Sequence, residues 1–122
     1  MIVGIGLDIV EVSRFGSEAH PRLEERILTP GERVRVPVSE RRRREYVAGR
    51  FAVKEATAKA AGCGIGKTVG WQDIEVLTDR AGRPAVTISP EVLALLGWED
   101  VSIHCSITHS QRLVAAQVIV ER

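Results

Sequence analysis

Residues 50–66 read RFAVKEATAKAAGCGIG, a helix-forming run that gives way to closely spaced glycines. Phe51, Glu55 and Lys59 recur every four residues in it, so the three side chains share one face of the expected helix. A Glu followed by a Lys at this spacing is most often a surface ion pair, worth about 0.2–0.5 kcal/mol. The aromatic residue in the same stripe indicates instead that this face approaches other structure, where a paired charge is costly and more often functional.

Further helices and strands are expected on both sides of this run. Ser39 is the expected N-cap of one long helix that ends near Gly62, because serine favours helix starts and glycine favours helix ends. The pattern from 13 to 28 is also helical, and Pro21 is expected to kink it or to divide it into two short helices. Apolar runs and turn residues predict a short helix at 90–96 and strands at 2–10, 74–78, 84–88, 101–108 and 113–120. Together they predict an α+β fold, a mainly antiparallel sheet packed with one long helix and shorter helices, in a single domain over residues 1–122.

Two of the expected strands differ in their polarity. Residues 2–10 are dense in Ile, Val and Leu, which predicts a largely buried strand in which an ionised Asp8 is costly unless something pairs with it. This leads to the hypothesis that Asp8 and Glu55 share a cation. The strand at 101–108 alternates strictly between apolar and polar residues, and its polar face should carry Ser102, His104, Ser106 and Thr108.

Composition excludes several classes of partner. Hydrophobic residues make up 44% and charged residues 27% of the 122, as in an ordinary globular protein, and a net charge of +1 gives no drive toward nucleic acid or membrane. No apolar run approaches the roughly 20 residues that cross a bilayer, and the N-terminus starts with a strand-like segment, so we expect a cytoplasmic protein. Cys63 and Cys105 lack the spacing of a zinc site, so both are expected to be small core residues.

The glycine loop, residues 62–68, differs from the phosphate loop of nucleotide hydrolases. Ala61 stands where that loop needs glycine, and the segment follows the expected helix, whereas a phosphate loop opens one. The favoured interpretation of these glycines is therefore a helix C-cap. Any phosphate would be contacted by loop amides and nearby cations, because the helix dipole points the wrong way for an anion.

The charged residues favour a hard cation and an anionic partner. Carboxylates with His104 and His109 are too hard and sparse a set for zinc, whereas Mg²⁺ is commonly held by one or two carboxylates plus substrate phosphates. The run from Arg41 to Arg44 opposes the dipole at the start of the long helix, which indicates either a solvated face or an anionic partner. A second basic group comprises Arg14, Arg22 and Arg26.

Three blocks of the sequence resemble one family closely. They are GIGLDIVE at 4–11, GRFAVKEATAKA at 49–60 followed by GIG at 64–66, and SITHS at 106–110. The chain resembles the holo-acyl-carrier-protein synthases, the small trimeric type of 4′-phosphopantetheinyl transferase. The resemblance covers essentially the whole chain and implies the fold of that superfamily. It also implies transfer of the phosphopantetheine arm of coenzyme A to a serine of an apo acyl carrier protein, which releases adenosine 3′,5′-bisphosphate.

The resemblance also implies roles for individual residues. Asp8 and Glu55 would hold Mg²⁺, and Lys59 would steady the charge that develops on the leaving phosphate. Either Glu55 or a metal-bound water would serve as the general base. Contacts to coenzyme A are implied for Arg42, Arg50, Gly64, Gly66, Ser106 and His109. Docking of the acidic carrier protein is implied for Arg14, Arg22 and Arg26.

The family forms homotrimers with active sites between subunits, so His109 is expected to serve the Asp8 and Glu55 of another chain. Two other functions are compatible with the same residues. One is a non-enzymatic module whose basic helices bind an acidic protein. The other is a Mg²⁺-dependent pyrophosphohydrolase, which would cleave coenzyme A without any carrier protein.

Overall fold

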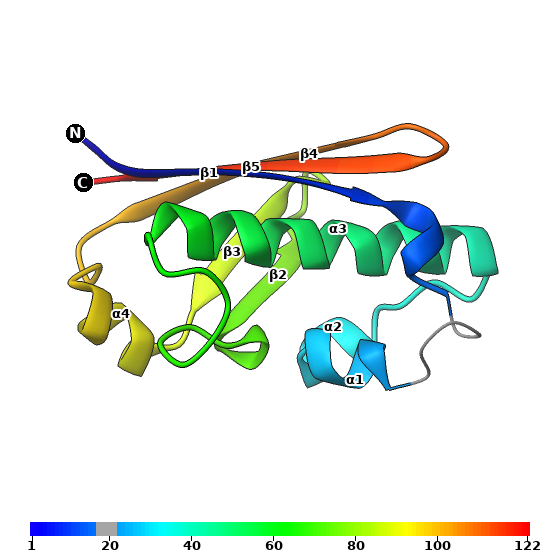
Figure 1. Ribbon diagram of the computed structural model, residues 1–122, viewed down its shortest axis with the longest axis horizontal. Helices are drawn as coiled ribbons and strands as arrows, with labels where there is room; N and C mark the ends of the chain where they lie inside the picture. Colours follow the sequence, from blue (N-terminus) through cyan, green and yellow to red (C-terminus); the bar gives the residue numbers. More distant parts are fainter. Residues whose placement is uncertain (17–21) are drawn as a thin grey trace.

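The structure, a computed structural model, describes residues 1–16 and 22–122 and has α+β architecture with antiparallel sheets (Figure 1). Its elements are, in chain order, β1 (Ile2–Glu11), η1 (Val12–Arg14), α1 (Leu23–Ile27), α2 (Pro30–Arg33), α3 (Glu40–Ala60), η2 (Trp71–Asp73), β2 (Ile74–Thr78), β3 (Pro84–Ile88), α4 (Pro90–Leu96), β4 (Ser102–His109) and β5 (Leu113–Glu121). The predicted fold class, with one long helix and several short ones, is confirmed.

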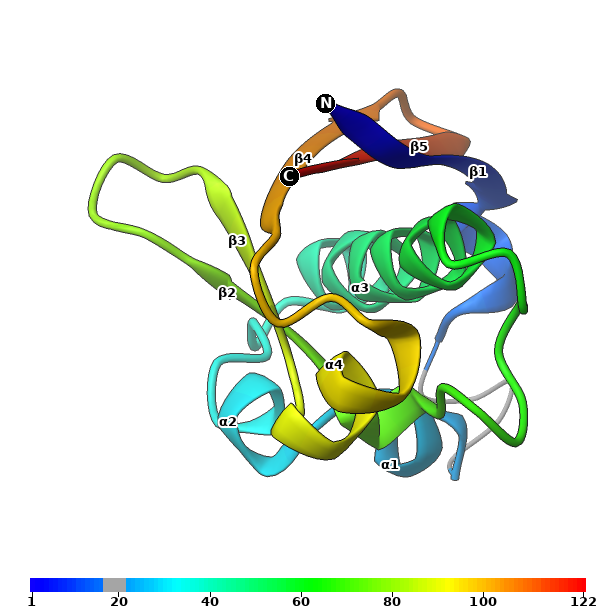
Figure 2. The same ribbon diagram turned by 90° about the vertical axis from the view of Figure 1, so that its left-hand side faces the viewer.

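The main sheet has three antiparallel strands in the order β1-β5-β4, and α3 runs along one face of it. Every second residue of β5 points toward α3 and is buried: Val114, Ala116, Val118 and Val120. Small buried residues of α3 face them, among them Ala48, Ala52 and Ala56. Figure 2 shows the β2–β3 hairpin extending to one side of α3, as a separate two-stranded sheet.

Two glycines of β1 let the strand lie directly on the helix. A Cβ atom added to Gly6 would stand 1.7 Å from the Ala56 carbonyl oxygen, and one added to Gly4 would stand 2.4 Å from the Ala60 carbonyl oxygen. Real Cβ atoms do not approach other atoms so closely. The Gly-x-Gly pattern therefore sets the distance between β1 and the turns of α3 that carry Glu55 and Lys59.

The expectation that residues 2–10 form a largely buried strand is wrong for this chain. From Gly4 onward only the even-numbered residues of β1 face α3, while Ile5, Leu7 and Ile9 are 61–63% exposed on the other face. The reason is that the helix covers just one side of the sheet. The polar positions predicted for β4 lie on the same outer face and are exposed, as expected.

The ends of α3 follow the predicted capping. The Ser39 hydroxyl accepts a hydrogen bond from the Arg42 amide at 3.3 Å, and the helix ends at Ala60, shortly before Gly62 with a φ of 78°. The helix α2 was missed, although Thr29 and Glu32 have the spacing of a capping box and form one here. In the segment from 13 to 28 the described residues form η1 and α1, and Pro21 lies outside the described residues.

Elsewhere the local predictions hold with one exception. The hairpin strands and α4 have the predicted bounds, and β4 pairs with β5 antiparallel. Cys63 is exposed in the glycine loop, so its assignment to the core is wrong, whereas Cys105 is half-buried beneath the sheet. Within the described ranges, no helix combines the length and apolar character that crossing a bilayer requires.

Candidate active site

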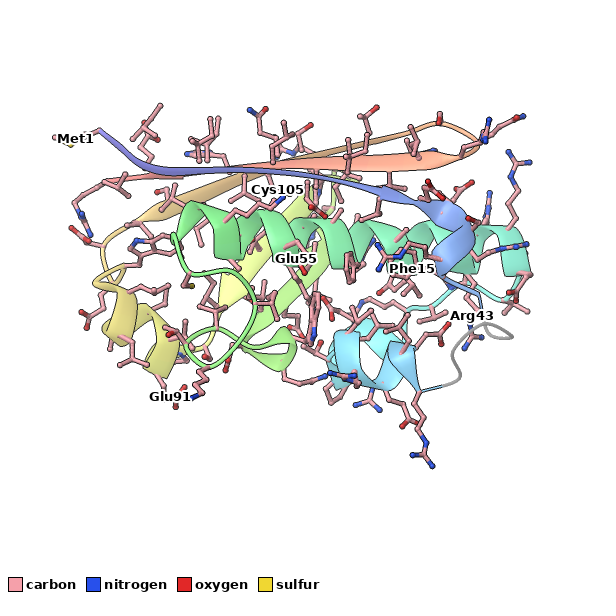
Figure 3. The ribbon with its side chains drawn as sticks, in the orientation of Figure 1. Met1, Phe15, Arg43, Glu55, Glu91 and Cys105 are labelled. Atoms are coloured by element: carbon pink, nitrogen blue, oxygen red, sulfur yellow. The ribbon has the colours of Figure 1, made fainter. Side chains whose placement is uncertain are left out.

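Asp8, Glu55 and Lys59 come together where β1 crosses the C-terminal half of α3. The Lys59 ammonium donates to the Asp8 Oδ1 atom at 3.0 Å and to the Leu7 carbonyl oxygen at 3.0 Å. Glu55 lies one turn before Lys59 on the same helix and is half-buried (Figure 3). The cost of burying Asp8 is therefore met in part by Lys59, which is itself half-exposed.

Burial and a neighbouring like charge disfavour the ionised form of one carboxylate of this cluster. Burial raises the pKa of Glu55, and the negative charge of Asp8 raises it further, while Lys59 and Arg14 act in the opposite direction. The Asp8 Oδ2 atom is buried and has no hydrogen-bond partner among the described residues. A buried oxygen of this kind ordinarily binds a donor, a water or a cation.

These residues fit a magnesium ion better than a transition metal. No group of three or more His, Cys, Asp or Glu side chains that could hold a metal occurs in the described part of the chain. The protein therefore offers two carboxylates, Asp8 and Glu55, as hard oxygen ligands. Mg²⁺ suits such a site because it keeps several waters and takes other ligands from substrate phosphates.

An aromatic cluster adjoins the carboxylates. The Phe51 ring lies 5.0 Å from the Phe15 ring and stacks on Trp71 at 4.9 Å, measured between centroids. The Arg14 guanidinium carbon lies 5.6 Å from the Phe15 centroid and 5.4 Å from the Phe51 centroid, near enough to Glu55 for its charge to oppose the rise in the pKa of Glu55. Phe51 therefore does pack against other structure, as its place in the helical stripe predicted.

Amides of the glycine loop already donate hydrogen bonds to carbonyl oxygens of the same chain. Gly62 and Gly64 have left-handed φ angles of 78° and 66°, which suit a turn after a helix. The Gly64 amide donates to the Ala58 carbonyl oxygen at 3.2 Å, and the Gly66 amide donates to the Val69 carbonyl oxygen at 2.9 Å. A phosphate bound by these two amides would compete with hydrogen bonds that shape the loop.

Arg42 and His109 lie at the other end of α3. Both line a shallow cavity of about 360 Å³ together with Arg41, Glu45 and Ser110. Thirteen residues separate Arg42 from Glu55, which corresponds to about 20 Å along the helix axis. Within one chain the structure therefore does not bring this pair to the carboxylates.

Arg50 and Ser106 also point away from Asp8. The Arg50 guanidinium stacks over the Tyr46 ring at 3.9 Å and reaches the Thr78 hydroxyl at 3.4 Å, on the side of the hairpin. Burial lowers the pKa of Arg50, and its Nε atom has no hydrogen-bond partner among the described residues. Ser106 is exposed on the outer face of β4.

The proposed docking arginines separate into two places. Arg14 lies against the aromatic cluster beside Glu55, whereas Arg22 and Arg26 are exposed at the start and in the last turn of α1. Lys54 and Glu32, which the sequence did not single out, form a fully buried ion pair close by. In the sequence, a lysine between Val53 and Glu55 gives only a weak signal for such a pair.

Comparison with known families assigns the chain and its fold to one of them. Residues 4–117 match the profile of the 4′-phosphopantetheinyl transferase superfamily. The chain belongs to this superfamily. A curated holo-[acyl-carrier-protein] synthase of Halalkalibacterium halodurans is 49% identical over all of this chain and 98% of the relative. The predicted enzyme class, a phosphopantetheinyl transferase of the holo-acyl-carrier-protein synthase type, is confirmed.

Solved structures of the family superpose closely on this transferase. The holo-(acyl-carrier-protein) synthase of Bacillus anthracis, in complex with CoA (3′,5′-ADP), has a TM-score of 0.86 and 43% identity and covers 99% of this chain and 97% of its own. The Helicobacter pylori holo-[acyl-carrier-protein] synthase, in complex with coenzyme A, has a TM-score of 0.81 and 31% identity and covers 96% and 99%. The ligands named for these two relatives are coenzyme A, the predicted substrate, and 3′,5′-ADP, the predicted product.

Proposed function

We propose that this transferase moves the 4′-phosphopantetheine group of coenzyme A to a serine of an apo acyl carrier protein, with Mg²⁺ as cofactor. The observation that carries the proposal is the meeting of Asp8, Glu55 and Lys59 around a buried carboxylate oxygen that lacks a partner. The hydroxyl oxygen of the serine forms a bond to the β-phosphorus of the pyrophosphate as its proton passes to a base, either Glu55 or a water, and the bond from that phosphorus to the bridging oxygen breaks. The products are holo carrier protein and adenosine 3′,5′-bisphosphate.

Each residue of the cluster has a distinct part in this proposal. Asp8 and Glu55 would hold Mg²⁺, which when bound neutralises the pyrophosphate and draws charge from the phosphorus under attack. Lys59 already orients Asp8 at 3.0 Å, and its exposed ammonium can turn to the leaving phosphate. Arg14, close to Glu55, is positioned to meet an acidic carrier as its serine enters.

The sheet supports a homotrimer with active sites shared between subunits. Ile5, Leu7 and Ile9 form an apolar row on the outer face of β1, and an exposed row of this kind is typical of a protein interface. The separation of about 20 Å between Arg42 and Glu55 points the same way. A neighbouring subunit would supply the coenzyme A contacts of Arg42, Arg50, Ser106 and His109 that one chain keeps apart from its carboxylates.

Intact mass spectrometry of an apo acyl carrier protein, after incubation with coenzyme A, Mg²⁺ and this protein, tests the proposal. We expect the carrier to gain one phosphopantetheine group, and EDTA to abolish the gain. Glu55→Gln should lose the transfer, whereas Glu91→Gln, on the exposed surface of α4, should keep it.

Two other outcomes would overturn the assignment. Loss of intact coenzyme A without any carrier product would indicate the pyrophosphohydrolase. No change in either molecule would indicate the binding module.

A further inference from the structure

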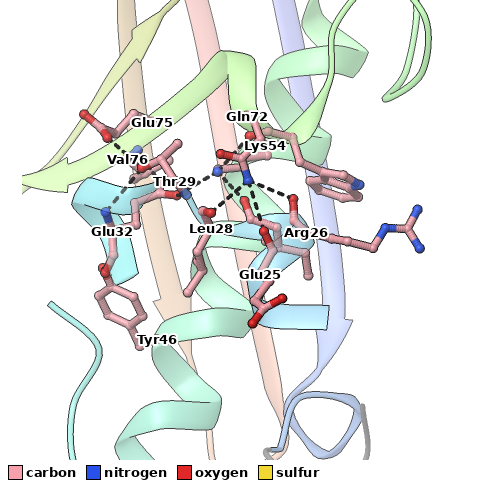
Figure 4. Close-up of polar contacts among 12 residues, drawn as sticks. Glu25, Arg26, Leu28, Thr29, Glu32, Tyr46, Lys54, Gln72, Glu75 and Val76 are labelled. Carbon is pink, nitrogen blue, oxygen red and sulfur yellow. Dashed lines mark hydrogen bonds and ion pairs between the residues drawn. The ribbon is translucent and has the colours of Figure 1, made fainter. Parts of the chain in front are cut away.

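Lys54 is a buried lysine whose hydrogen bonds are all satisfied within the chain (Figure 4). Its side chain is 0% exposed. The ammonium donates to the Ile27 carbonyl oxygen at 2.5 Å, to Glu32 Oε1 at 2.7 Å and to the Trp71 carbonyl oxygen at 2.9 Å. These three bonds use its three protons, so Lys54 has no donor left for a substrate.

Both carboxylate oxygens of its partner, Glu32, also have hydrogen-bond partners within the chain. Besides Lys54, the Oε1 atom accepts from the Thr29 amide at 2.7 Å, and the Oε2 atom accepts from the Val76 amide at 2.6 Å. Glu32 is 0% exposed. The pair therefore joins the end of α1, the start of α2, the first residue of η2 and strand β2 to a single turn of α3, the turn that also carries Glu55.

The helix α1 depends on such contacts for its position. With five residues it is too short to be stable alone. Arg43 of α3 donates to both Glu24 oxygens, at 2.8 and 2.5 Å, near its first turn. At its other end, Gln72 donates to the carbonyl oxygens of Glu25, Arg26 and Leu28 at 2.8–3.2 Å.

The chemistry of the pair favours a geometric role over simple stabilisation. A buried ion pair is often replaceable by apolar residues without loss of stability, because desolvation offsets most of the attraction. Its directional bonds, however, fix the angles and distances between the segments that they join. Here those segments are the helix that presents Arg22 and Arg26 and the helix that presents Glu55.

We propose that Lys54 and Glu32 are positioning residues that hold α1 at the orientation from which the carrier protein delivers its serine to the Asp8–Glu55 cluster. This inference rests on the proposed function and adds to it a link between docking and chemistry. Neither residue touches substrate. Loss of the pair should therefore impair use of the carrier protein and leave binding of coenzyme A intact.

Three variants test the link, each compared with the native protein. Glu32→Gln keeps the side-chain volume but replaces one carboxylate oxygen by an NH₂ group, which cannot accept a hydrogen bond. The variant therefore loses either the bond from the Val76 amide or the bonds from Lys54 and the Thr29 amide. Lys54→Met removes the three donors. Gln72→Leu loosens the end of α1 from an exposed position, so it stays informative if the buried variants do not fold.

Val92→Ala is the matched control, because Val92 is buried in α4, which lies at the opposite end of the molecule from α1 (Figure 1). KM for apo carrier protein and KM for coenzyme A are measured separately, and hydrogen exchange is followed at the amides of 23–28. We expect the three variants to raise the carrier KM about fivefold or more, with the coenzyme A KM within about twofold. Exchange at 23–28 should rise about tenfold in these variants and stay unchanged in the control.

The outcomes separate this inference from the proposed function. Equal changes in both KM values, or unchanged exchange at 23–28, would refute the positioning role while transfer by the native protein remained intact. A native protein that transfers nothing to any carrier would refute the proposed function itself.

Discussion

Substitution of Gly6 by alanine should push β1 away from α3 at the proposed active site. The new Cβ atom would lie 1.7 Å from the Ala56 carbonyl oxygen and 2.7 Å from its carbonyl carbon, whereas an ordinary contact begins at 3.4 Å. Both obstacles are backbone atoms, so no side-chain rotation relieves them. The strand and the helix must therefore move apart by about 1.7 Å, the difference between the clash and the ordinary contact.

That displacement is large on the scale of the site. The Lys59 to Asp8 contact is 3.0 Å long, and a shift of this size would break it and withdraw Asp8 from Glu55. A misplacement of about 1 Å can cost on the order of 100-fold in rate, so we expect Gly6→Ala to lower transfer by at least that factor. Overpacking of this kind typically costs about 1–3 kcal/mol in the free energy of unfolding.

The assay pairs transfer rates with denaturant unfolding of the same preparations. Gly49→Ala is the control, since a Cβ atom there would meet only Ile107 side-chain atoms at 3.9 and 4.0 Å. In the interior of α3 that change should stabilise the protein by about 0.5–1 kcal/mol and keep activity. A Gly6→Ala protein with native transfer rate and native stability would refute the close-approach argument.

Three further predictions concern the cluster, the sheet face and the thiols. Asp8→Asn should lower Mg²⁺-dependent transfer about 10²–10³-fold with an unchanged unfolding midpoint, and near-native turnover at saturating Mg²⁺ would exclude the metal role. Leu7→Glu should convert the proposed trimer to smaller species in light scattering, because each subunit would place a charge in the proposed apolar interface; a native protein that is already monomeric would contradict the assembly. Iodoacetamide at pH 8 should label exposed Cys63 and spare Cys105, because burial raises the pKa of the Cys105 thiol to about 11 and the thiolate is the nucleophile. Labelling of Cys105 should therefore appear only as the pH approaches 11, and mass spectrometry of Cys63→Ser at pH 8 would reveal any earlier reaction.

The sequence by itself determined the elements whose signals are local. Ser39 and Gly62 bracket α3, the residues of the β2–β3 hairpin form strands with the predicted bounds, and the strict alternation in β4 places its polar side chains on one face. Each of these depends on backbone preferences and side-chain spacing within a few residues. The family and the enzyme class could be predicted too, because the blocks that resemble the family are short and contiguous in the sequence.

Part of the candidate site could be predicted from the sequence. A carboxylate in an apolar strand required a partner, and the structure supplies Lys59, from the helical stripe that the sequence had selected. The glycines at 4 and 6 gave no local sign of their purpose. Their role exists only because the Ala56 and Ala60 carbonyl oxygens, some fifty residues away in the chain, lie against them.

Only the tertiary structure decided what each face of an element meets. An apolar run such as 2–10 has the same appearance whether a second layer of its own chain or another subunit covers it, and here the outer row is left open. Lys54 would pass for an ordinary surface lysine of an amphipathic helix, yet Ile27, Glu32 and Trp71 enclose it from three separate segments. Local patterns fix the backbone, but burial and pairing depend on residues distant in sequence, and those meet only once the chain has folded.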